Sequence, residues 1–433
     1  MKKIYSDFVL LSKRTRVFFI LLFICSVFYK LFFLFYQSNI SGPDAAEYVY
    51  LSKLFAESGI INYIKSNDPF SFWRLPTLPF ILYITHSLTV FYIIQLLATY
   101  FLAYNFYQII KEITHQNQLA FYCFFAVLFL PYINIAACAP LTEFMQVSFI
   151  IYCFRKVLYR QYDIFLISAL VLFCFLRAEA QYFIYFLILR DVIKKQFNRL
   201  LIYTVPFLFI ALWCVRNKIN FDSFSLVNPV LSSRAMIGSL YGVIYEKADS
   251  DFHDRYNYYQ ARDYINNKAF VLKYKNAVKE EIKEKLLSDP IGYIRIRMKQ
   301  FSKGFLYLMF NMEQLPDDDW KFKKHKNYKE LITVNEKWAY STIWKNKDYS
   351  KLFARLLYNG GFAFIHLFGF LFIFFQYKKL LPLLFILFNF CFVAIVEIDM
   401  RYLITIQSVC VCAFIILLYA LIQHKTLKLD WIT

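Results

Sequence analysis

Residues 17–36 of this chain read VFFILLFICSVFYKLFFLFY, and this apolar run decides the class of the fold. A run of this length is enough to cross the roughly 30 Å hydrocarbon core of a bilayer as one helix. Basic residues precede it between positions 2 and 16, and it lacks a small-x-small cleavage site. We therefore expect a retained helix whose basic end faces the cytoplasm.

The composition of the whole chain agrees with a membrane protein. Of the 433 residues, 59% are hydrophobic and 21% are aromatic, which is far outside soluble globular usage. The formal net charge is +19, but the basic residues cluster at the ends of apolar runs, as topology signals do. We assign no nucleic-acid partner. The nine cysteines lie in or beside apolar runs, where a buried apolar role fits better than a disulfide framework.

The basic residues also predict the direction of the later spans. The apolar runs are 91–110, 119–137, 144–154, 164–175, 182–189, 200–215, 352–375, 380–396 and 403–422. With the first run they make ten spans, or eight if the hairpin of residues 162–190 only re-enters the membrane. Both termini then lie in the cytoplasm.

The expected fold is an all-α polytopic membrane protein with about eight to ten transmembrane helices. Residues 1–216 form a transmembrane catalytic module, in which residues 39–88 are an outer active-site loop with interfacial helices. The run 76–85 belongs to this loop because it is too short to span. Residues 217–350 form an exported, mostly helical domain, and residues 351–433 form the C-terminal transmembrane helices.

Ionisable residues gather on the predicted outer side. Charged groups near membrane depth are costly and tend to mark substrate paths. A carboxylate at the boundary can accept a proton, and guanidinium groups bind phosphate in a fork. The candidates are Asp44, Glu47, Arg74, Glu143, Arg177, Glu179, Glu397, Asp399 and Arg401.

Six of these candidates also have a purely structural interpretation. An aspartate followed three residues later by a glutamate fits a capping box, and an acid in the first turn of a helix is favoured by the helix dipole. The alternatives are a capping box for Asp44 and Glu47, a helix start for Glu143, an i, i+4 ion pair for Glu397 and Arg401, and an interfacial anchor for Arg74.

Several common chemistries lack their sequence patterns. The chain has only nine glycines and no Walker-type or dinucleotide-binding motif, and its six histidines show no zinc-type spacing. Cytoplasmic nucleotide chemistry and zinc hydrolysis are therefore unsupported. We assign no metal-ligating residue and no certain cofactor, and a divalent metal is left open.

Five short motifs occur in an order that resembles a known family. They are Gly42-Pro43-Asp44-x-x-x-Tyr48, Trp73-Arg74-x-Pro76-x-x-Pro79, Leu141-Thr142-Glu143, Leu176-Arg177-x-Glu179 and Arg401-Tyr402. Together they resemble the landmarks of GT-C fold glycosyltransferases. The likeness is closest to glycosyltransferase family 39, the relatives of protein O-mannosyltransferases and lipid A aminoarabinose transferases. It covers residues 17–216 and the last two spans.

The resemblance implies a polyprenyl-phosphate-sugar donor that is used on the outer face of the membrane. It assigns the catalytic carboxylate to Asp44 and a second acidic residue to Glu143, and we expect both to be catalytic. The chain departs from the family at Ala45, where a second acid is usual, and at its two prolines, which are separated as Pro76 and Pro79. We assign substrate binding to Glu47, Tyr48, Arg74, Arg177, Glu179, Glu397 and Arg401.

The function expected from the sequence is transfer of a sugar from this lipid donor to a lipid, glycan or protein acceptor. The enzyme is expected in the bacterial inner membrane, with its site on the periplasmic face, in lipopolysaccharide or protein glycosylation of the cell envelope. Two alternatives stay open: an O-antigen polymerase or ligase, and a lipid or polysaccharide transporter without transferase activity. A transporter should carry acids and bases through its spans, and these spans are nearly free of them.

Overall fold

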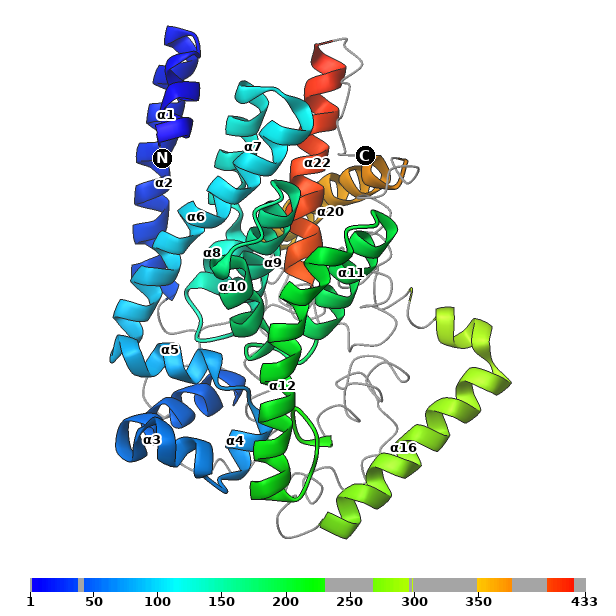
Figure 1. Ribbon diagram of the computed structural model, residues 1–433. Helices are drawn as coiled ribbons and strands as arrows, with labels where there is room; N and C mark the ends of the chain where they lie inside the picture. Colours follow the sequence, from blue (N-terminus) through cyan, green and yellow to red (C-terminus); the bar gives the residue numbers. More distant parts are fainter. Residues whose placement is uncertain are drawn as a thin grey trace.

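The structure is a computed structural model, and it describes residues 2–37, 43–229, 268–295, 298, 349–375 and 403–423. Within these ranges the chain folds into helices, and they contain no β-strand. Most of the helices pack side by side in one bundle (Figure 1). The predicted all-α class is confirmed for the part of the chain described.

Four helices are long and apolar enough to cross a membrane. They are α2 (Lys13–Gln37), α6 (Leu88–Thr114), α12 (Leu200–Phe221) with the preceding 3-10 turn η1 (Phe197–Arg199), and α22 (Ile404–Ile422). A fifth span results if α7 (Asn117–Phe129) and α8 (Pro131–Ala137), which are bent by 53°, are one. By length and composition these helices support a multi-pass membrane protein.

Three of the remaining predicted spans correspond to shorter helices. Helices α9 (Glu143–Leu158), α10 (Ile164–Cys174) and α11 (Ala180–Ile193) have 16, 11 and 14 residues, fewer than the roughly 20 that a full span needs. Helix α20 (Tyr349–Phe375) covers the predicted run 352–375, and the run 380–396 lies outside the described residues. The count of eight to ten spans therefore stays a prediction.

The predicted first outer loop folds into three helices. These are α3 (Pro43–Lys65), α4 (Pro69–Trp73) and α5 (Thr77–Thr85), which lie together at one end of the bundle, here called the loop end (Figure 1). Gly59 breaks α3 with φ 75° and ψ 165°, a backbone conformation that residues with a Cβ rarely adopt. Helix α5 has nine residues, so it lies with the loop rather than spanning.

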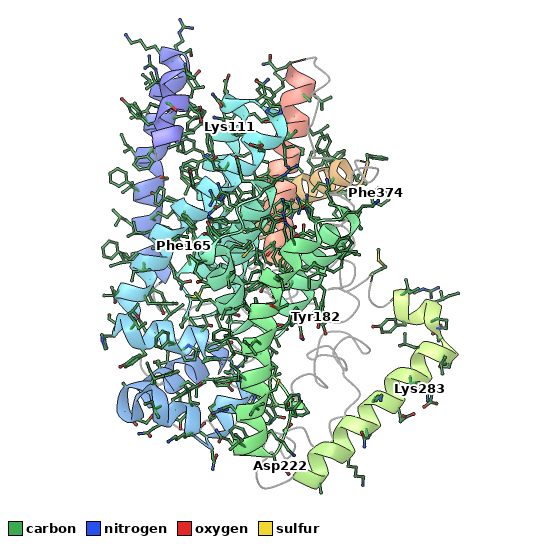
Figure 2. The ribbon with its side chains drawn as sticks, in the orientation of Figure 1. Lys111, Phe165, Tyr182, Asp222, Lys283 and Phe374 are labelled. Atoms are coloured by element: carbon green, nitrogen blue, oxygen red, sulfur yellow. The ribbon has the colours of Figure 1, made fainter. Side chains whose placement is uncertain are left out.

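The two ends of the bundle are marked by residues far apart in the sequence. Lys111, near the end of α6, lies at the end opposite Asp222, which follows α12 (Figure 2). The short N-terminal helix α1 (Lys2–Val9) is held beside Lys111, because Asp7 pairs with Lys111 and accepts a hydrogen bond of 2.7 Å from Tyr107. The structure therefore places the predicted cytoplasmic residues 7 and 111 together.

Two apolar cores hold the bundle together. The larger joins α2, α6, α7, α8, α9 and α22, and Ala45 at the start of α3 belongs to it. The second core joins α9, α10, α11 and α12, and Tyr48 and Leu78 of the loop end belong to it. A smaller cluster packs Leu51, Tyr63 and Leu75 against Trp213 of α12. The loop end is thus part of the same packed body as the bundle.

The predicted exported domain is described only in part. Helix α16 (Lys268–Ser288) lies within it and stands apart from the bundle in Figure 1. Helix α12 continues without interruption through residue 216, where we place the domain boundary, and ends at Phe221. The division of the chain at that point stays a prediction.

Several helices end at a residue in the left-handed conformation, a place usually taken by glycine. In this glycine-poor chain the positions are His86, His115, Arg160, Lys195 and Asp222, with φ between 53° and 56°. Each of these side chains carries a Cβ and so pays a steric cost that glycine avoids. The helix ends are therefore set by the surrounding fold more than by local preference.

Candidate functional site

The loop end is built around Asp68. Its carboxylate caps α4 by accepting a hydrogen bond of 2.8 Å from the Phe70 backbone N–H, with Pro69 as the first helical residue, an arrangement typical of a helix start. Tyr50 of α3 donates a hydrogen bond of 2.6 Å to the same carboxylate. This bond, with burial, raises the pKa of Tyr50 to about 12. Helices α3 and α4 are thereby joined.

Arg216 of α12 fixes the loop end to the bundle. Its guanidinium donates to the backbone oxygens of Ile64, at 2.9 Å, and Ser66, at 3.0 Å, and to the Ser71 hydroxyl at 2.9 Å. It also lies 4.8 Å from the ring centroid of Trp213. An arginine that donates to several buried acceptors in this way is a structural clamp. Arg216 is not among the candidates predicted from the sequence.

The first group of candidate residues comes from α3 and the turn after α4. Arg74 Nε donates to Glu47 Oε2 at 2.7 Å, and the guanidinium lies 5.3 Å from the ring centroid of Tyr48. The Arg74 and Glu47 side chains are only 15% and 11% exposed. Residues 47, 48 and 74, which the sequence assigns to substrate binding, therefore lie together.

The second group comes from the start of α9 and the turn between α10 and α11. Arg177 lies 3.7 Å from Glu143 and 3.4 Å from Glu179, and it donates a hydrogen bond of 3.2 Å to the Thr142 hydroxyl. The Arg177 and Glu143 side chains are 9% and 4% exposed. A buried guanidinium thus joins two carboxylates that are far apart in the sequence.

A backbone tether connects the two groups. The Thr77 N–H donates to the Phe175 carbonyl at 3.1 Å, and the Thr77 hydroxyl donates to the Leu172 carbonyl at 3.0 Å. Thr77 follows Arg74 by three residues, and Phe175 precedes Arg177 by two. We call Glu47, Arg74, Glu143, Arg177 and Glu179 the carboxylate cluster; it contains three acids and two arginines.

Asp44 lies in the first turn of α3, since the helix begins at Pro43. Its neighbour Ala45 is 2% exposed and packs in the larger core, while the Asp44 side chain lies outside the described part of the structure. The Glu47 carboxylate contacts Arg74. A carboxylate in the first turn is favoured by the positive end of the helix dipole.

The structural interpretation of Glu143 holds in part. Helix α9 begins at Glu143, with Thr142 as its N-cap residue. The Thr142 side chain makes no capping bond and instead accepts from Arg177. Glu143 therefore both begins a helix and contacts a cation. The last candidates, Glu397, Asp399 and Arg401, lie outside the described residues.

Lys30 is a charged residue that is not among the candidates predicted from the sequence. It lies within α2 and is 6% exposed. Its ammonium donates to the Leu128 carbonyl at 2.9 Å and to the Asn134 side chain. Leu128 is close to the end of α7, where carbonyls lose their helical partners and a cation is favoured. The sequence does carry a signal for Lys30, because a charged residue inside an apolar run is costly and tends to mark a functional position.

The described residues contain no group of three or more histidine, cysteine, aspartate or glutamate side chains that could hold a metal ion.

A scan against models of protein families, a search of curated proteins and a search of solved structures each returned no match. Chemically, the carboxylate cluster offers proton acceptors next to guanidinium groups at one end of a membrane bundle.

Proposed function

We propose that this protein is an integral-membrane glycosyltransferase that uses a polyprenyl-phosphate-linked sugar. The sugar passes to a lipid, glycan or protein acceptor at the loop end, which we assign to the outer face of a bacterial inner membrane. The apolar surface of the spans suits the polyprenyl chain, and the carboxylate cluster suits the polar part of the donor.

The observation that carries this proposal is the buried contact of Arg177 with Glu143 and Glu179. Displacing a lipid phosphate from an anomeric carbon needs a base for the acceptor proton and cations for the charge that grows on the departing phosphate. Arg177 and Arg74 are suited to the phosphate because guanidinium is always charged and binds in a fork. The neighbouring acids hold both arginines in place.

Asp44 is the residue to which we assign the base. It lies in the helical turn that also carries Glu47 and Tyr48, so its backbone is fixed close to the Arg74 contacts. The family resemblance of residues 42–48 assigns the same role to it. Glu143 is assigned as the second acidic residue, and its contact with Arg177 gives it a positioning role for the phosphate-binding cation.

A transporter is the second candidate, and Lys30 is the observation that favours it. A buried lysine inside a span is the kind of group that transport paths use, and the break between α7 and α8 resembles the discontinuous helices of transporters. The Lys30 ammonium donates to a backbone carbonyl and to a side-chain amide oxygen at that break. These contacts also account for Lys30 as a structural cation, so we rank transport second.

The decisive experiment replaces Asp44 by asparagine in the purified full-length chain and measures sugar transfer from a purified lipid donor in proteoliposomes. Asparagine has the size of aspartate and loses only the dipole contribution of the first turn, roughly 0.3–1 kcal/mol, but it cannot accept the proton. We expect transfer to fall by roughly a hundredfold or more, as the loss of a positioned base implies, while the protein still inserts and folds.

The matched control is Asp68→Asn, which makes the same chemical change in the same loop. Asparagine can still cap α4, so transfer by this variant should stay close to that of the wild type. Wild-type transfer by the Asp44→Asn variant would remove Asp44 from catalysis. Movement of intact donor across the membrane, with no sugar transferred by the wild type, would favour the transporter.

A further inference from the structure

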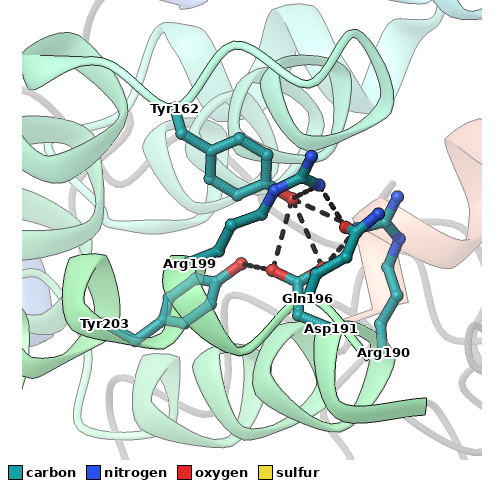
Figure 3. A network of polar contacts seen from close by, with 6 residues as sticks. All are labelled: Tyr162, Arg190, Asp191, Gln196, Arg199 and Tyr203. Carbon is teal, nitrogen blue, oxygen red and sulfur yellow. Dashed lines mark hydrogen bonds and ion pairs between the residues drawn. The ribbon is translucent and has the colours of Figure 1, made fainter. Parts of the chain in front are cut away.

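A second polar site lies at the other end of the α10–α11 hairpin, away from the tip that carries Arg177. It is formed by Tyr162 before α10, Arg190 and Asp191 near the end of α11, Arg199 of η1 and Tyr203 of α12 (Figure 3). Asp191 is fully buried. The Tyr203 hydroxyl donates to it at 2.8 Å, and Arg190 contacts it at 2.6 Å.

Two guanidinium groups converge on one neutral oxygen in this site. Arg190 donates to the Tyr162 hydroxyl oxygen at 3.2 Å, and Arg199 donates to the same oxygen at 3.3 Å. Arg199 also lies 4.4 Å from the centroid of the Tyr162 ring. Asp191 accepts from the Tyr162 hydroxyl at 3.2 Å and balances one of these two charges, so one positive charge of the pair remains to attract a further anion.

Further cations surround this pair. Arg160 and Lys195 are exposed. Burial lowers the pKa of the Lys194 amine, and the nearby charges of Arg190 and Arg160 lower it further. We call Arg160, Arg190, Lys194, Lys195 and Arg199 the basic cluster. Among the described residues of this network the carboxylate is Asp191, which Arg190 contacts, and the nearby Asp163 pairs with Lys156 at 2.6 Å. An excess of four positive charges results.

Large apolar side chains flank the basic cluster and are open to the surroundings. Ile164 and Phe165 at the start of α10 are 65% and 66% exposed, and Phe197 and Leu201 on the other side are 59% and 73% exposed. A free anion such as phosphate would cover only the cations. A lipid would cover both, with its headgroup on the cations and its acyl chains on the apolar side chains.

We propose that the basic cluster binds the phosphate headgroup of an anionic phospholipid, whose acyl chains cover Phe165, Phe197 and Leu201. This site is separate from the carboxylate cluster and does not depend on the proposed transfer reaction. Basic residues at this end are also expected from topology alone. The proposal adds that they form one specific site, with Arg190, Arg199 and Tyr162 at its centre.

The test uses the full-length chain in a zwitterionic detergent, with a fluorescent phosphatidylglycerol as the probe. The first variant combines Arg160→Asn and Lys195→Asn, which removes two charges. Both residues are exposed and have left-handed backbones, a conformation that asparagine tolerates well, so this variant should fold. We expect its affinity for the probe to fall roughly thirtyfold, about fivefold for each basic side chain.

Two controls match this variant. The double variant Lys53→Gln with Lys65→Gln removes the same charge from α3 at the loop end. The variant His115→Asn places asparagine at another left-handed position without removing a lysine or an arginine. Neither control should alter binding of the probe. Arg199→Gln, which also removes the contact with Tyr162, should weaken binding by at least as much as one of the exposed substitutions.

Competition identifies the source of the phosphate. Unlabelled phosphatidylglycerol should displace the probe, whereas inorganic phosphate and phosphatidylcholine should not. Equal binding by the wild type and the first variant would overturn the site, as would an equal loss in the Lys53 and Lys65 control. Displacement by inorganic phosphate at the same concentration as the lipid would overturn the lipid assignment.

Discussion

The carboxylate cluster and the basic cluster are built from the same elements but have opposite charge balances. The α10–α11 hairpin contributes to both, with Arg177 and Glu179 at its tip and Arg190 and Asp191 near its other end. At the tip, three acids share two arginines. At the other end, the basic cluster holds five cations, and Arg190 of this cluster contacts the buried Asp191. One hairpin thus joins an acid-rich site to a cation-rich site.

This difference indicates what each site can bind. In the carboxylate cluster both arginines already contact an acid, so a phosphate must share them with Glu47, Glu143 and Glu179. The acids then lower the affinity for phosphate, but they supply proton acceptors and fix the arginines. In the basic cluster the cations exceed the acids, which favours stable binding of an anion. Turnover suits the first site, and retention of a ligand suits the second.

The largest effect is expected from Arg177→Ala, which removes the cation of the buried acid contacts. Glu143 is 4% exposed, and an ionised carboxylate left in such a place without its cation costs much free energy. We expect the free energy of unfolding to fall by about 3–5 kcal/mol. Denaturant titration of the purified protein in detergent measures this change.

A double variant separates charge from packing at this position. Adding Glu143→Gln to Arg177→Ala removes the unpaired charge, and part of the lost stability should return. Arg177→Ala with the stability of the wild type would show that the buried contact contributes nothing. It would also remove the contrast in charge balance with the basic cluster, because Arg177 would then be as available to a phosphate as Arg199.

A smaller effect is expected from Glu47→Gln, which keeps an acceptor for Arg74 but removes its opposite charge. The cost in stability should be about 1 kcal/mol, typical of one hydrogen bond. Arg74 then becomes more available to phosphate, so we expect the KM for the lipid donor to fall by roughly fivefold at low salt. Steady-state kinetics at two salt concentrations measures it.

The control for this prediction is Glu57→Gln, an exposed position on the same helix, which should leave KM unchanged. An increase of KM in the Glu47 variant would contradict the sharing of Arg74 between acid and donor. It would mean that Glu47 itself contacts the sugar or orients Arg74 in a way that glutamine cannot replace.

The helical spans could be predicted from the sequence, because long apolar runs have few alternatives in a membrane. The run 17–36 becomes most of α2, and the run 403–422 becomes α22. The gathering of Glu143 and Arg177 at one end also follows from the alternating direction of the spans. Their contact distance does not, because it depends on how α9 packs against the hairpin.

Other features needed the tertiary structure. Arg216 lies about 150 residues after the carbonyls that it binds, and no local pattern announces such contacts. The convergence of Arg190 and Arg199 on Tyr162 likewise depends on the turn through η1. Lys30 was visible in the sequence, but its acceptor at Leu128 exists only because α7 ends close by, before Pro131.

The smallest effect is expected at helix ends with a left-handed backbone, which occur at both ends of the bundle. His86 ends α5 at the loop end and His115 ends α6 at the opposite end, both with left-handed backbones. Glycine adopts this conformation without a steric cost, although it also gains entropy when the chain unfolds. We expect His115→Gly to stabilise the protein by roughly 0.5–1 kcal/mol, measured as a higher midpoint of thermal unfolding.

His86→Gly serves as the matched variant, because it makes the same substitution at the end of α5, in the loop end. Equal stabilisation at both positions, with unchanged sugar transfer and lipid binding, would show that these left-handed helix ends affect stability alone. If His86→Gly instead lowers transfer while His115→Gly does not, the rigid end of α5 helps to position Arg74 through the Thr77 tether. The contrast between the two ends would then include a mechanical part, in which backbone strain at the end of α5 acts on the carboxylate cluster.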